Sequence, residues 1–388
     1  MEEQYFITNK MRYTANFIEM NFKKNGIDLE KDDNSNYTKT DFISEIQQQV
    51  GNYVNRNFEQ IVVLGGAGSS ISGDEFGKTV FELAKTIDSA LSEEGSLYSI
   101  KKMAKLCRYS YDDIGNDKFN LEDFISQIRK ATQFIPNDKK AKYESTQKEI
   151  FDVIKSNTNY SYDSRKLKQG AFINILANKV KAPNKLTIAT TNYDVLFEEA
   201  ALDMGYTVID GFTFSPEAYF DADIFEWNLV RDIPNLKTKE LEYKKKVINL
   251  IKLHGSVTWE REGDKIIRKK KEKVEEPVMI FPSSDKYLQS YEEPYFELFS
   301  KFQEVLNRPN TLLITTGFSF GDSHIATMIS RAITHNHGLS VLVTDFSLNK
   351  TTDGWKSLVS HMESGHSIVF LKSSFADLPS YLGGVTLC

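Results

Sequence analysis

The chain has 388 residues, of which 40% are hydrophobic, so it is long enough to bury one large core or a core with an inserted subdomain. Its formal net charge of -6 gives no overall indication of nucleic-acid binding, which normally shows as a basic domain or stripe, and nucleic acid is not an expected partner. The only cysteines, Cys107 and Cys388, are far apart in the chain and no run approaches about 18 apolar residues, so we expect a cytoplasmic protein without a membrane span.

The first part of the chain differs from the rest in composition and in the spacing of its apolar residues. Residues 1–58 are polar and mixed, with weakly periodic stretches on both sides of a turn-rich interruption at residues 32–36. This pattern predicts a short helical N-terminal appendage.

From Ile61 onward, short runs rich in β-branched residues alternate with stretches of helical periodicity. Such alternation is typical of strands and helices that build a parallel sheet. The sequence therefore predicts an α/β fold with one doubly wound, mostly parallel, Rossmann-like sheet. The runs expected to form its strands are 61–64, 186–190, 248–253, 278–281, 311–315, 340–344 and 367–371.

About 120 residues separate the first two expected strands, and their apolar residues recur with helical spacing. So long a connection predicts a helical subdomain inserted at about residues 77–184. The expected domains are thus the appendage over residues 1–58 and a main domain over residues 59–385. A basic run at residues 268–273 follows a turn signal and has acidic neighbours, so we interpret it as a solvated loop rather than a nucleic-acid surface.

A glycine-rich turn follows the first expected strand. The strand runs directly into Gly65-Gly66-Ala67-Gly68-Ser69-Ser70. Glycines let a backbone approach a pyrophosphate closely, and the N–H groups at a helix start favour an anion, so the turn is a candidate phosphate site. A tight strand-to-helix turn without a ligand is an equally good interpretation, because the fuller Gly-x-Gly-x-x-Gly pattern is absent.

The second expected strand, 186–190, ends in a polar cluster that consists of Thr191, Asn192, Tyr193 and Asp194. Ligands of an open parallel sheet bind at the carboxyl ends of its strands, where an amide and a carboxylate could hold sugar hydroxyls or a carboxamide. A helix N-cap is the alternative role for either side chain, and it explains one polar residue but not the whole set.

A histidine follows the strand expected at residues 248–253. Because histidine titrates near neutral pH, His254 can accept a hydroxyl proton as a general base, although a structural histidine is an equal alternative. His335 and His337 resemble a pair of metal ligands, but on a helix end they would not face the same way, so we place them on the solvated surface.

The strand expected at residues 311–315 gives way to a fourth turn of small and polar residues, Gly317-Phe318-Ser319-Phe320-Gly321-Asp322. One such turn is common. Four of them at the carboxyl edge of one sheet converge on the cleft expected for a dinucleotide.

Taken in order, these four turns resemble the motifs of the sirtuin family over roughly residues 59–382, and in particular the sirtuin-like domains of bacterial antiphage systems, which deplete NAD. The matching segments are Gly66-Ala67-Gly68-Ser69-Ser70, Thr191-Asn192-Tyr193-Asp194, Lys252-Leu253-His254-Gly255-Ser256 and Gly317-Phe318-Ser319-Phe320-Gly321-Asp322. The resemblance implies that the main domain binds NAD and uses it as a substrate.

The resemblance also implies roles for individual residues. Asn192 would orient the nicotinamide ribose and the attacking water, Asp194 would hold the carboxamide, and His254 would be the general base. The residues implied to bind the rest of NAD are Gly66, Ala67, Gly68, Ser69, Thr191, Gly317, Ser319 and Asp345.

The departures from the family determine which activity is expected. Deacetylating sirtuins carry a four-cysteine zinc module, which a chain with two cysteines cannot form, so we expect no structural zinc. The segment 71–77 also lacks the Pro-Asp-Phe-Arg continuation of the deacetylases, which leaves Asp74 and Phe76 without an assigned role. The expected activity is therefore that of an NAD glycohydrolase, and a zinc-free sirtuin deacylase is the alternative within the family.

The resemblance further implies a defence effector that forms a homo-oligomer and is regulated by assembly or by a partner, in some systems a HerA-type hexameric ATPase. An alternative of another class is an assembly module that binds NAD or ADP-ribose without turnover. A nucleotide hydrolase or nuclease has little support, because the chain has no Gly-x-x-x-x-Gly-Lys-Ser/Thr loop.

Overall fold

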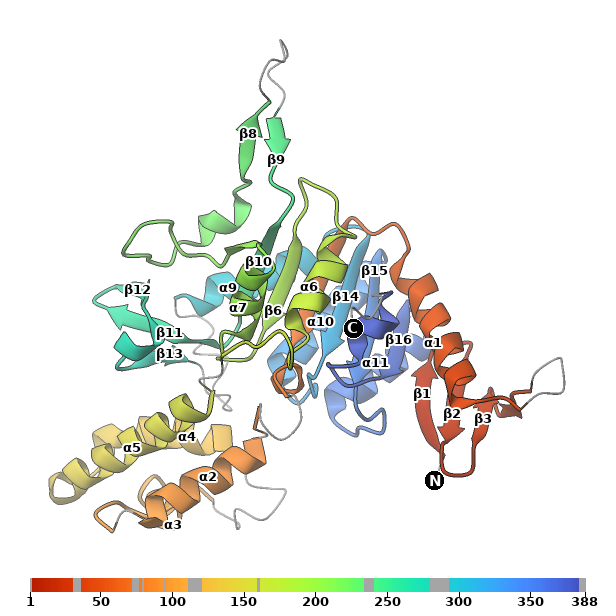
Figure 1. Cartoon of the computed structure of the whole chain (residues 1–388). Helices are drawn as coiled ribbons and strands as arrows, with labels where there is room; N and C mark the ends of the chain where they lie inside the picture. Colours follow the sequence, from red (N-terminus) through yellow and green to blue (C-terminus); the bar gives the residue numbers. More distant parts are fainter. Residues whose placement is uncertain are drawn as a thin grey trace.

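The computed structural model describes residues 2–30, 36–71, 77–78, 80–93, 95–110, 121–158, 161–233, 241–279 and 293–383. An 11-stranded sheet runs through the molecule, with helices packed on both of its faces (Figure 1). This architecture confirms the predicted α/β, doubly wound, mostly parallel Rossmann-like fold.

The centre of the sheet is parallel, and its strands consist almost entirely of buried apolar residues, as strands covered on both faces require. The chain moves from β5 towards β6 and later returns to β14 on the other side of β5, so the strand order reverses between β5 and β14. Ligands of open α/β sheets bind at the carboxyl edge of such a switch point. In spatial order the parallel strands are β16 (Ile368–Lys372), β15 (Leu339–Asp345), β14 (Thr311–Thr316), β5 (Gln60–Gly65), β6 (Leu186–Thr190), β10 (Val247–Lys252) and β7 (Thr207–Ile209).

One expected strand lies elsewhere. The prediction that 278–281 belongs to the main sheet is wrong: β13 (Pro277–Met279) pairs with β11 (Gly255–Glu262), which also pairs with β12 (Lys265–Arg268), and residues 280 and 281 lie outside the described part. Gly255, the first residue of β11 and three residues beyond the end of β10, adopts a φ of +86°, so the chain turns away from the sheet there and forms a separate antiparallel layer.

The prediction of a helical segment is wrong for residues 3–28, which form antiparallel strands that extend the main sheet. They are β1 (Glu3–Ile7), β2 (Arg12–Asn16), β3 (Asn21–Lys24) and β4 (Ile27–Asp28), and helix α1 (Lys39–Val54) follows them. Phe6 of β1 pairs with Leu371 of β16, and buried Tyr13 and Phe22 pack beside Phe42 of α1. Runs of four or five residues are too short to show whether their period is that of a strand or a helix.

Each face of the sheet has its own helices. One face carries α9 (Tyr295–Leu306), α10 (Ser323–His335) and α11 (Asp353–Glu363). The other carries α1, α6 (Gln169–Ala177), α7 (Leu196–Asp203) and α12 (Leu378–Tyr381). These two layers bury the sheet and leave its carboxyl edge for the turns that follow the strands.

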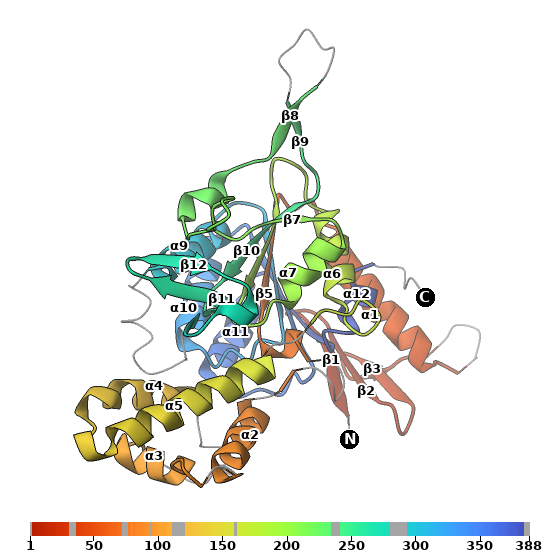
Figure 2. The ribbon, with the colours of Figure 1, turned by 60° about the vertical axis from the view of Figure 1, so that its left-hand side comes forward.

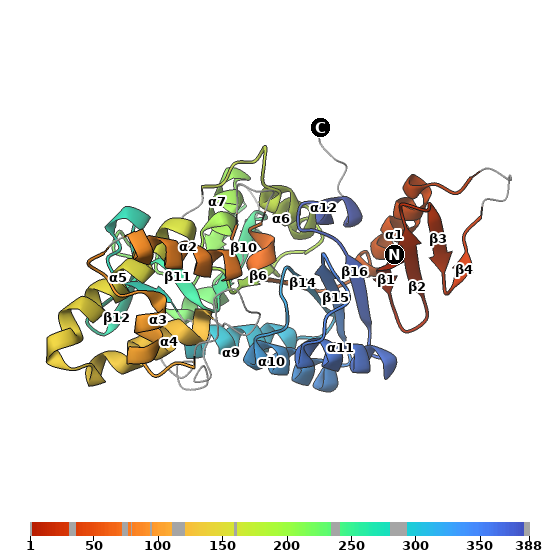
Figure 3. The ribbon, with the colours of Figure 1, turned by 90° about the horizontal axis from the view of Figure 1, so that it is seen from below.

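Between β5 and α6 the chain forms a helical unit with an apolar core of its own. Its helices are α2 (Val80–Glu93), α3 (Ile100–Leu106), α4 (Leu121–Ala131) and α5 (Asn137–Thr158). The same core includes Tyr193, Val195 and Val257, so the unit packs directly on the segments that follow β6 and β10. Figure 3 shows this unit and the N-terminal strands at opposite ends of the molecule.

A short hairpin of β8 (Val230–Asp232) and β9 (Leu241–Tyr243) projects from the body of the molecule beyond β7 and β10 (Figures 1 and 2). No helix in the described part of the chain has the length and apolar character needed to cross a membrane.

Candidate functional site

The strand register places the predicted turns at the same height along the carboxyl edge of the sheet. Gly65 of β5 pairs with Thr190 of β6 on one side and with Thr316 of β14 on the other, and Thr190 pairs in turn with Lys252 of β10. Asn192 and His254 therefore each lie two residues beyond a directly paired position on neighbouring strands. Since adjacent strands are about 4.8 Å apart, the structure brings the predicted asparagine and histidine into one site.

The glycine turn after β5 packs against the turn after β14. The N–H of Gly66 donates to the Thr316 carbonyl at 3.0 Å, and the N–H of Gly68 donates to the Gly317 carbonyl at 3.0 Å. A Cβ on Gly66 would lie 2.5 Å from the Gly317 oxygen. Close packing between the two turns thus explains why glycine is needed at these positions, as the tight-turn interpretation requires. The same packing uses two of the N–H groups that were expected to bind phosphate.

The remaining predicted residues of these two turns differ in accessibility. Ala67 and Ser319 are exposed, Gly68 and Gly317 are partly buried, and the Ser69 side chain is fully buried. The Ser69 hydroxyl donates to the Gly66 carbonyl at 2.7 Å. Ser69 therefore supports the turn from inside, while Ala67 and Ser319 lie where a ligand can reach them.

Asn192 is anchored by the glycine turn. Its Nδ2 lies 2.7 Å from the Ser70 hydroxyl, 2.9 Å from the Gly66 carbonyl and 3.2 Å from the Ser69 hydroxyl, and the residue is only 9% exposed. Its own backbone N–H donates to the Thr190 hydroxyl at 3.1 Å. The side-chain oxygen of Asn192 is thereby turned away from these acceptors, which leaves it as the group that can accept a hydrogen bond from water or a ribose hydroxyl.

Asp194 has two roles in the structure. One carboxylate oxygen accepts a hydrogen bond from the Ser70 hydroxyl at 2.6 Å, and the other accepts from the backbone N–H of Leu196 at 3.1 Å, at the start of α7. Val195, not Asp194, is the N-cap of α7 and makes no side-chain cap hydrogen bond, so the helix-cap interpretation does not account for Asp194; its carboxylate closes the turn before α7 and also lies in the site. Ser70 connects Asp194 to Asn192, so the three polar groups form one buried network.

A buried ion pair lies behind this network. Lys252, the last residue of β10, pairs with Glu198 of α7 at 3.0 Å and also donates to the backbone carbonyl of Asp194. Burial raises the pKa of Glu198, and the ammonium of Lys252 opposes that shift. The pair fixes the start of α7 against β10 and so holds the segment 191–195 in place.

His254 contacts a carboxylate from another strand end. Its Nε2 lies 3.2 Å from Oδ2 of Asp322, and the two side chains are 5% and 7% exposed. The second oxygen of Asp322 accepts hydrogen bonds from the N–H groups of His324 and Ile325, which begin α10. The helix cap therefore fixes the carboxylate that contacts the imidazole.

Asp345 ends β15 at the same edge and is 3% exposed. Its Oδ2 pairs with the Lys350 ammonium at 2.6 Å, and its Oδ1 accepts from the N–H of Ser347 at 3.0 Å. A ribose hydroxyl that binds Asp345 would therefore share a carboxylate already held by a cation.

The structure adds residues to which the sequence motifs had assigned no role. Ser70 and Asp322 lie inside the quoted motifs, so their hydroxyl and carboxylate were visible but unassigned. Gln169 had no signal at all, because it lies about 100 residues from Ser69, whose carbonyl it binds at 2.9 Å. Asp74 and Phe76 lie outside the described residues. Within the described part of the chain, no group of three or more His, Cys, Asp or Glu side chains is placed to hold a metal ion.

Comparison with known families finds a SIR2-like domain at residues 186–353. The matched range begins with β6 and includes Asn192, Asp194, His254 and Asp345, whereas the glycine turn after β5 precedes it. The match supports the sirtuin-like resemblance for this part of the chain. Comparison with curated proteins finds no match.

Proposed function

We propose that this protein is an NAD glycohydrolase that cleaves the nicotinamide–ribose bond and releases nicotinamide and ADP-ribose. The observation that carries the proposal is that Asn192 and His254 lie at one level, two residues beyond the ends of neighbouring strands, beside the switch point of the sheet. The SIR2-like domain at residues 186–353 supports NAD as the substrate in general terms. The proposed activity, rather than deacylation, rests on the two cysteines of the chain, which exclude a four-cysteine zinc module.

In the proposed reaction the bond between C1′ of the ribose and the nicotinamide nitrogen breaks, and the bonding electrons leave with neutral nicotinamide. The positive charge left on the ribose is quenched when a water oxygen bonds to C1′. The side-chain oxygen of Asn192 orients that water or the ribose hydroxyls, and His254 accepts the proton that is released. Preorganised dipoles at the site stabilise the oxocarbenium-like state.

Asn192 and His254 are already held by neighbouring side chains before the ribose binds. Asn192 and His254 are 9% and 4% exposed, and they contact Ser70 and Asp322. Catalytic hydrogen bonds often reach their working geometry only in the complex, so binding of the ribose is expected to adjust these contacts rather than to remove them.

The test is release of nicotinamide from NAD by the purified full chain, measured by chromatography. His254→Ala and Asn192→Ala are each expected to lower turnover by about 10²–10⁴-fold, the usual contribution of positioned acid–base groups. His335→Ala and Asn52→Ala, both exposed, are the matched controls and should keep wild-type turnover. Wild-type nicotinamide release by both site variants would refute the assignment.

We further propose that this activity depletes NAD in antiphage defence, in an oligomer or under control of a HerA-type hexameric ATPase. The support is the resemblance of the four motifs to defence sirtuin-like domains. Slow turnover by the chain alone that rises when the partner is added would fit a regulated enzyme. Tight NAD binding without turnover under both conditions would favour the assembly module, and consumption that requires an acyl-lysine peptide would favour a deacylase.

A further inference from the structure

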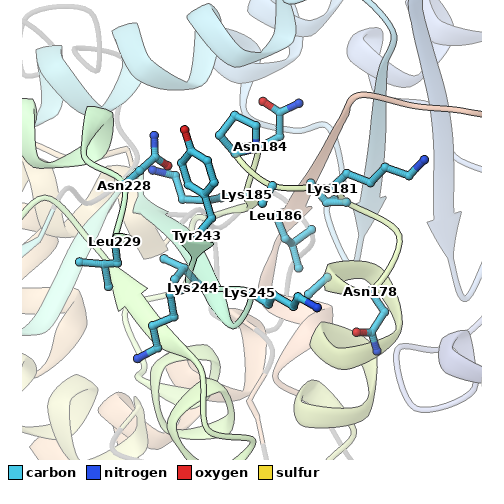
Figure 4. A pocket seen from close by; sticks show the side chains of 15 residues that line it. Asn178, Lys181, Asn184, Lys185, Leu186, Asn228, Leu229, Tyr243, Lys244 and Lys245 are labelled. Atoms are coloured by element: carbon cyan, nitrogen blue, oxygen red, sulfur yellow. The ribbon is translucent and has the colours of Figure 1, made fainter. Parts of the chain in front are cut away.

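A hollow of about 300 Å³ lies at the amino-terminal edge of the sheet, opposite the candidate site (Figure 4). Leu186 and Val247, the first residues of β6 and β10, form its floor, and the loop 177–185 and the base of the β8–β9 hairpin form its walls. The two strands span 5 and 6 residues, so at about 3.3 Å per residue this hollow is on the order of 20 Å from the site.

The lining of the hollow carries an excess of positive charge. It contains Lys181, Lys185, Lys244 and Lys245, and none of the described residues that line it is Asp or Glu. This excess occurs in a chain whose formal net charge is -6. An excess of like charge around one hollow is unfavourable, and an anion that binds there lowers this cost.

In a neighbouring hollow, acidic side chains pair with the basic ones. Its lining includes Lys185 as well as Glu226, which pairs with Lys301, and Arg308, which pairs with Glu304 at 2.6 Å. Among the ion pairs between described residues, none involves a lysine of the 300 Å³ hollow. The carbonyls at the C-terminal end of α6 favour a nearby cation, but they account for at most one of the four lysines.

Two of the lysines are held in fixed positions by neutral groups. Lys185 is partly buried and donates to the Trp227 carbonyl at 2.6 Å and to the Phe225 carbonyl at 3.3 Å, and burial lowers its pKa. Lys244 donates to the Thr207 hydroxyl at 2.7 Å. These partners are neutral and orient the two ammonium groups, and the carboxylate of Glu226 acts on Lys185 as a partial counter-charge.

The other lining groups indicate the class of anion. Three amide side chains, from Asn178, Asn184 and Asn228, and the ring of Tyr243 line the hollow together with the lysines (Figure 4). Amides can bind the edge of a base or a sugar hydroxyl, and an aromatic ring can pack on a base. The volume lies at the lower end of the range typical of small-molecule sites.

We infer that this hollow binds a nucleotide that carries a pyrophosphate group, of the nucleoside diphosphate class. The lysines contact the phosphates, and the amides and Tyr243 hold the nucleoside. The site is separate from the proposed NAD site and does not depend on the proposed activity. Since β6 and β10 connect the hollow to Asn192 and His254, a bound nucleotide is placed to influence the site through these two strands.

The test is isothermal titration calorimetry of the full chain with ADP, inorganic pyrophosphate and a single-stranded oligonucleotide. We expect ADP to bind more tightly than pyrophosphate, because only ADP contacts the amides and the tyrosine. Lys181→Gln/Lys245→Gln removes two exposed charges without breaking a described contact, and it should weaken the hollow's affinity for ADP by about tenfold or more. If ADP also binds the candidate site at the opposite edge, the wild type binds two ADP molecules, and the Lys181→Gln/Lys245→Gln protein is expected to bind only one with the original affinity.

The matched control is Lys102→Gln/Lys105→Gln, which removes two exposed charges from α3 and should leave ADP binding unchanged. No ADP binding by the wild type would overturn the inference, as would equal affinity and stoichiometry in the Lys181→Gln/Lys245→Gln protein. Binding of the oligonucleotide alone, lost in that variant, would also overturn it in favour of a nucleic-acid surface. None of these readings requires NAD turnover, so the inference and the proposed function fail separately.

Discussion

Asp322 performs two tasks with its two carboxylate oxygens. Oδ1 caps α10 by accepting from the N–H groups of His324 and Ile325, and Oδ2 lies 3.2 Å from Nε2 of His254. A carboxylate held by a helix cap fixes the orientation of the imidazole that it contacts. Asp322 is therefore a positioning residue for the proposed general base.

The two tasks can be separated, because asparagine caps helices as well as aspartate does but carries no charge. Asp322→Asn is expected to keep the wild-type melting temperature and the KM for NAD while kcat falls at least about tenfold, part of the contribution of a positioned base. Asp322→Ala should lose about 1 kcal/mol of stability as well, since it removes the cap. Unchanged kcat in the Asp322→Asn protein would show that the carboxylate serves the helix alone.

Individual site residues were predictable to different degrees. Asn192, Asp194 and His254 follow predicted strands within compact motifs, and the register of the sheet then fixes their common level. The pairing of Asp322 with His254 joins two strand ends 68 residues apart, so it depends on the strand order, which the sequence does not specify. The contact of Gln169 with the Ser69 carbonyl depends in the same way on where α6 packs.

At the scale of elements, the packing of the two turns determines the geometry of the switch point. Gly317 has a φ of +59°, and a Cβ there would lie 2.4 Å from the backbone carbon of Gly68. Both the backbone conformation and the space therefore require glycine. Since these turns connect β5 and β14 to the helices that follow them, their contact fixes the strand ends that carry the site.

Gly317→Ala is accordingly expected to destabilise the protein by about 1–3 kcal/mol from backbone strain alone, with a further cost from the clash. Gly51→Ala is the control: this glycine lies inside α1 with its nearest atom 3.9 Å from a built Cβ, and the change should stabilise by about 0.5–1 kcal/mol. Denaturant titration measures both. Equal stability of the two variants would contradict the turn-on-turn packing.

The elements that were missed or misassigned from the sequence share a physical cause. β7 has only 3 residues and the strands before residue 28 have at most 5, so none of them shows enough periods to distinguish a strand from a helix or a loop. Residues 278–281 have the composition of a core strand, but the turn at Gly255 sends β11 out of the sheet and creates a second layer for β13 to join. Composition predicts that a strand forms and does not predict which sheet it joins.

At the scale of the whole molecule, the N-terminal strands are part of the main sheet rather than a separate appendage. β1 pairs with β16, so the edge that the parallel strands would otherwise expose is covered by the start of the chain. The side chain of Phe6 is 1% exposed and lies in the same apolar cluster as Leu342 and Leu371 of β15 and β16. The beginning and the end of the chain therefore share one core.

This shared core predicts a cooperative response to a change near the N-terminus. Phe6→Ala should lower the free energy of unfolding by about 3–5 kcal/mol and shift the single denaturant transition seen by both circular dichroism and tryptophan fluorescence. Ile18→Ala, at a side chain that is 91% exposed, should change stability by no more than about 0.5 kcal/mol. If residues 1–58 were an independent appendage, Phe6→Ala would instead add an early, separate transition and leave the main one in place. Coincident shifts in both probes are expected, because all three tryptophans lie beyond residue 58, so fluorescence reports on a part of the chain that does not contain the substitution.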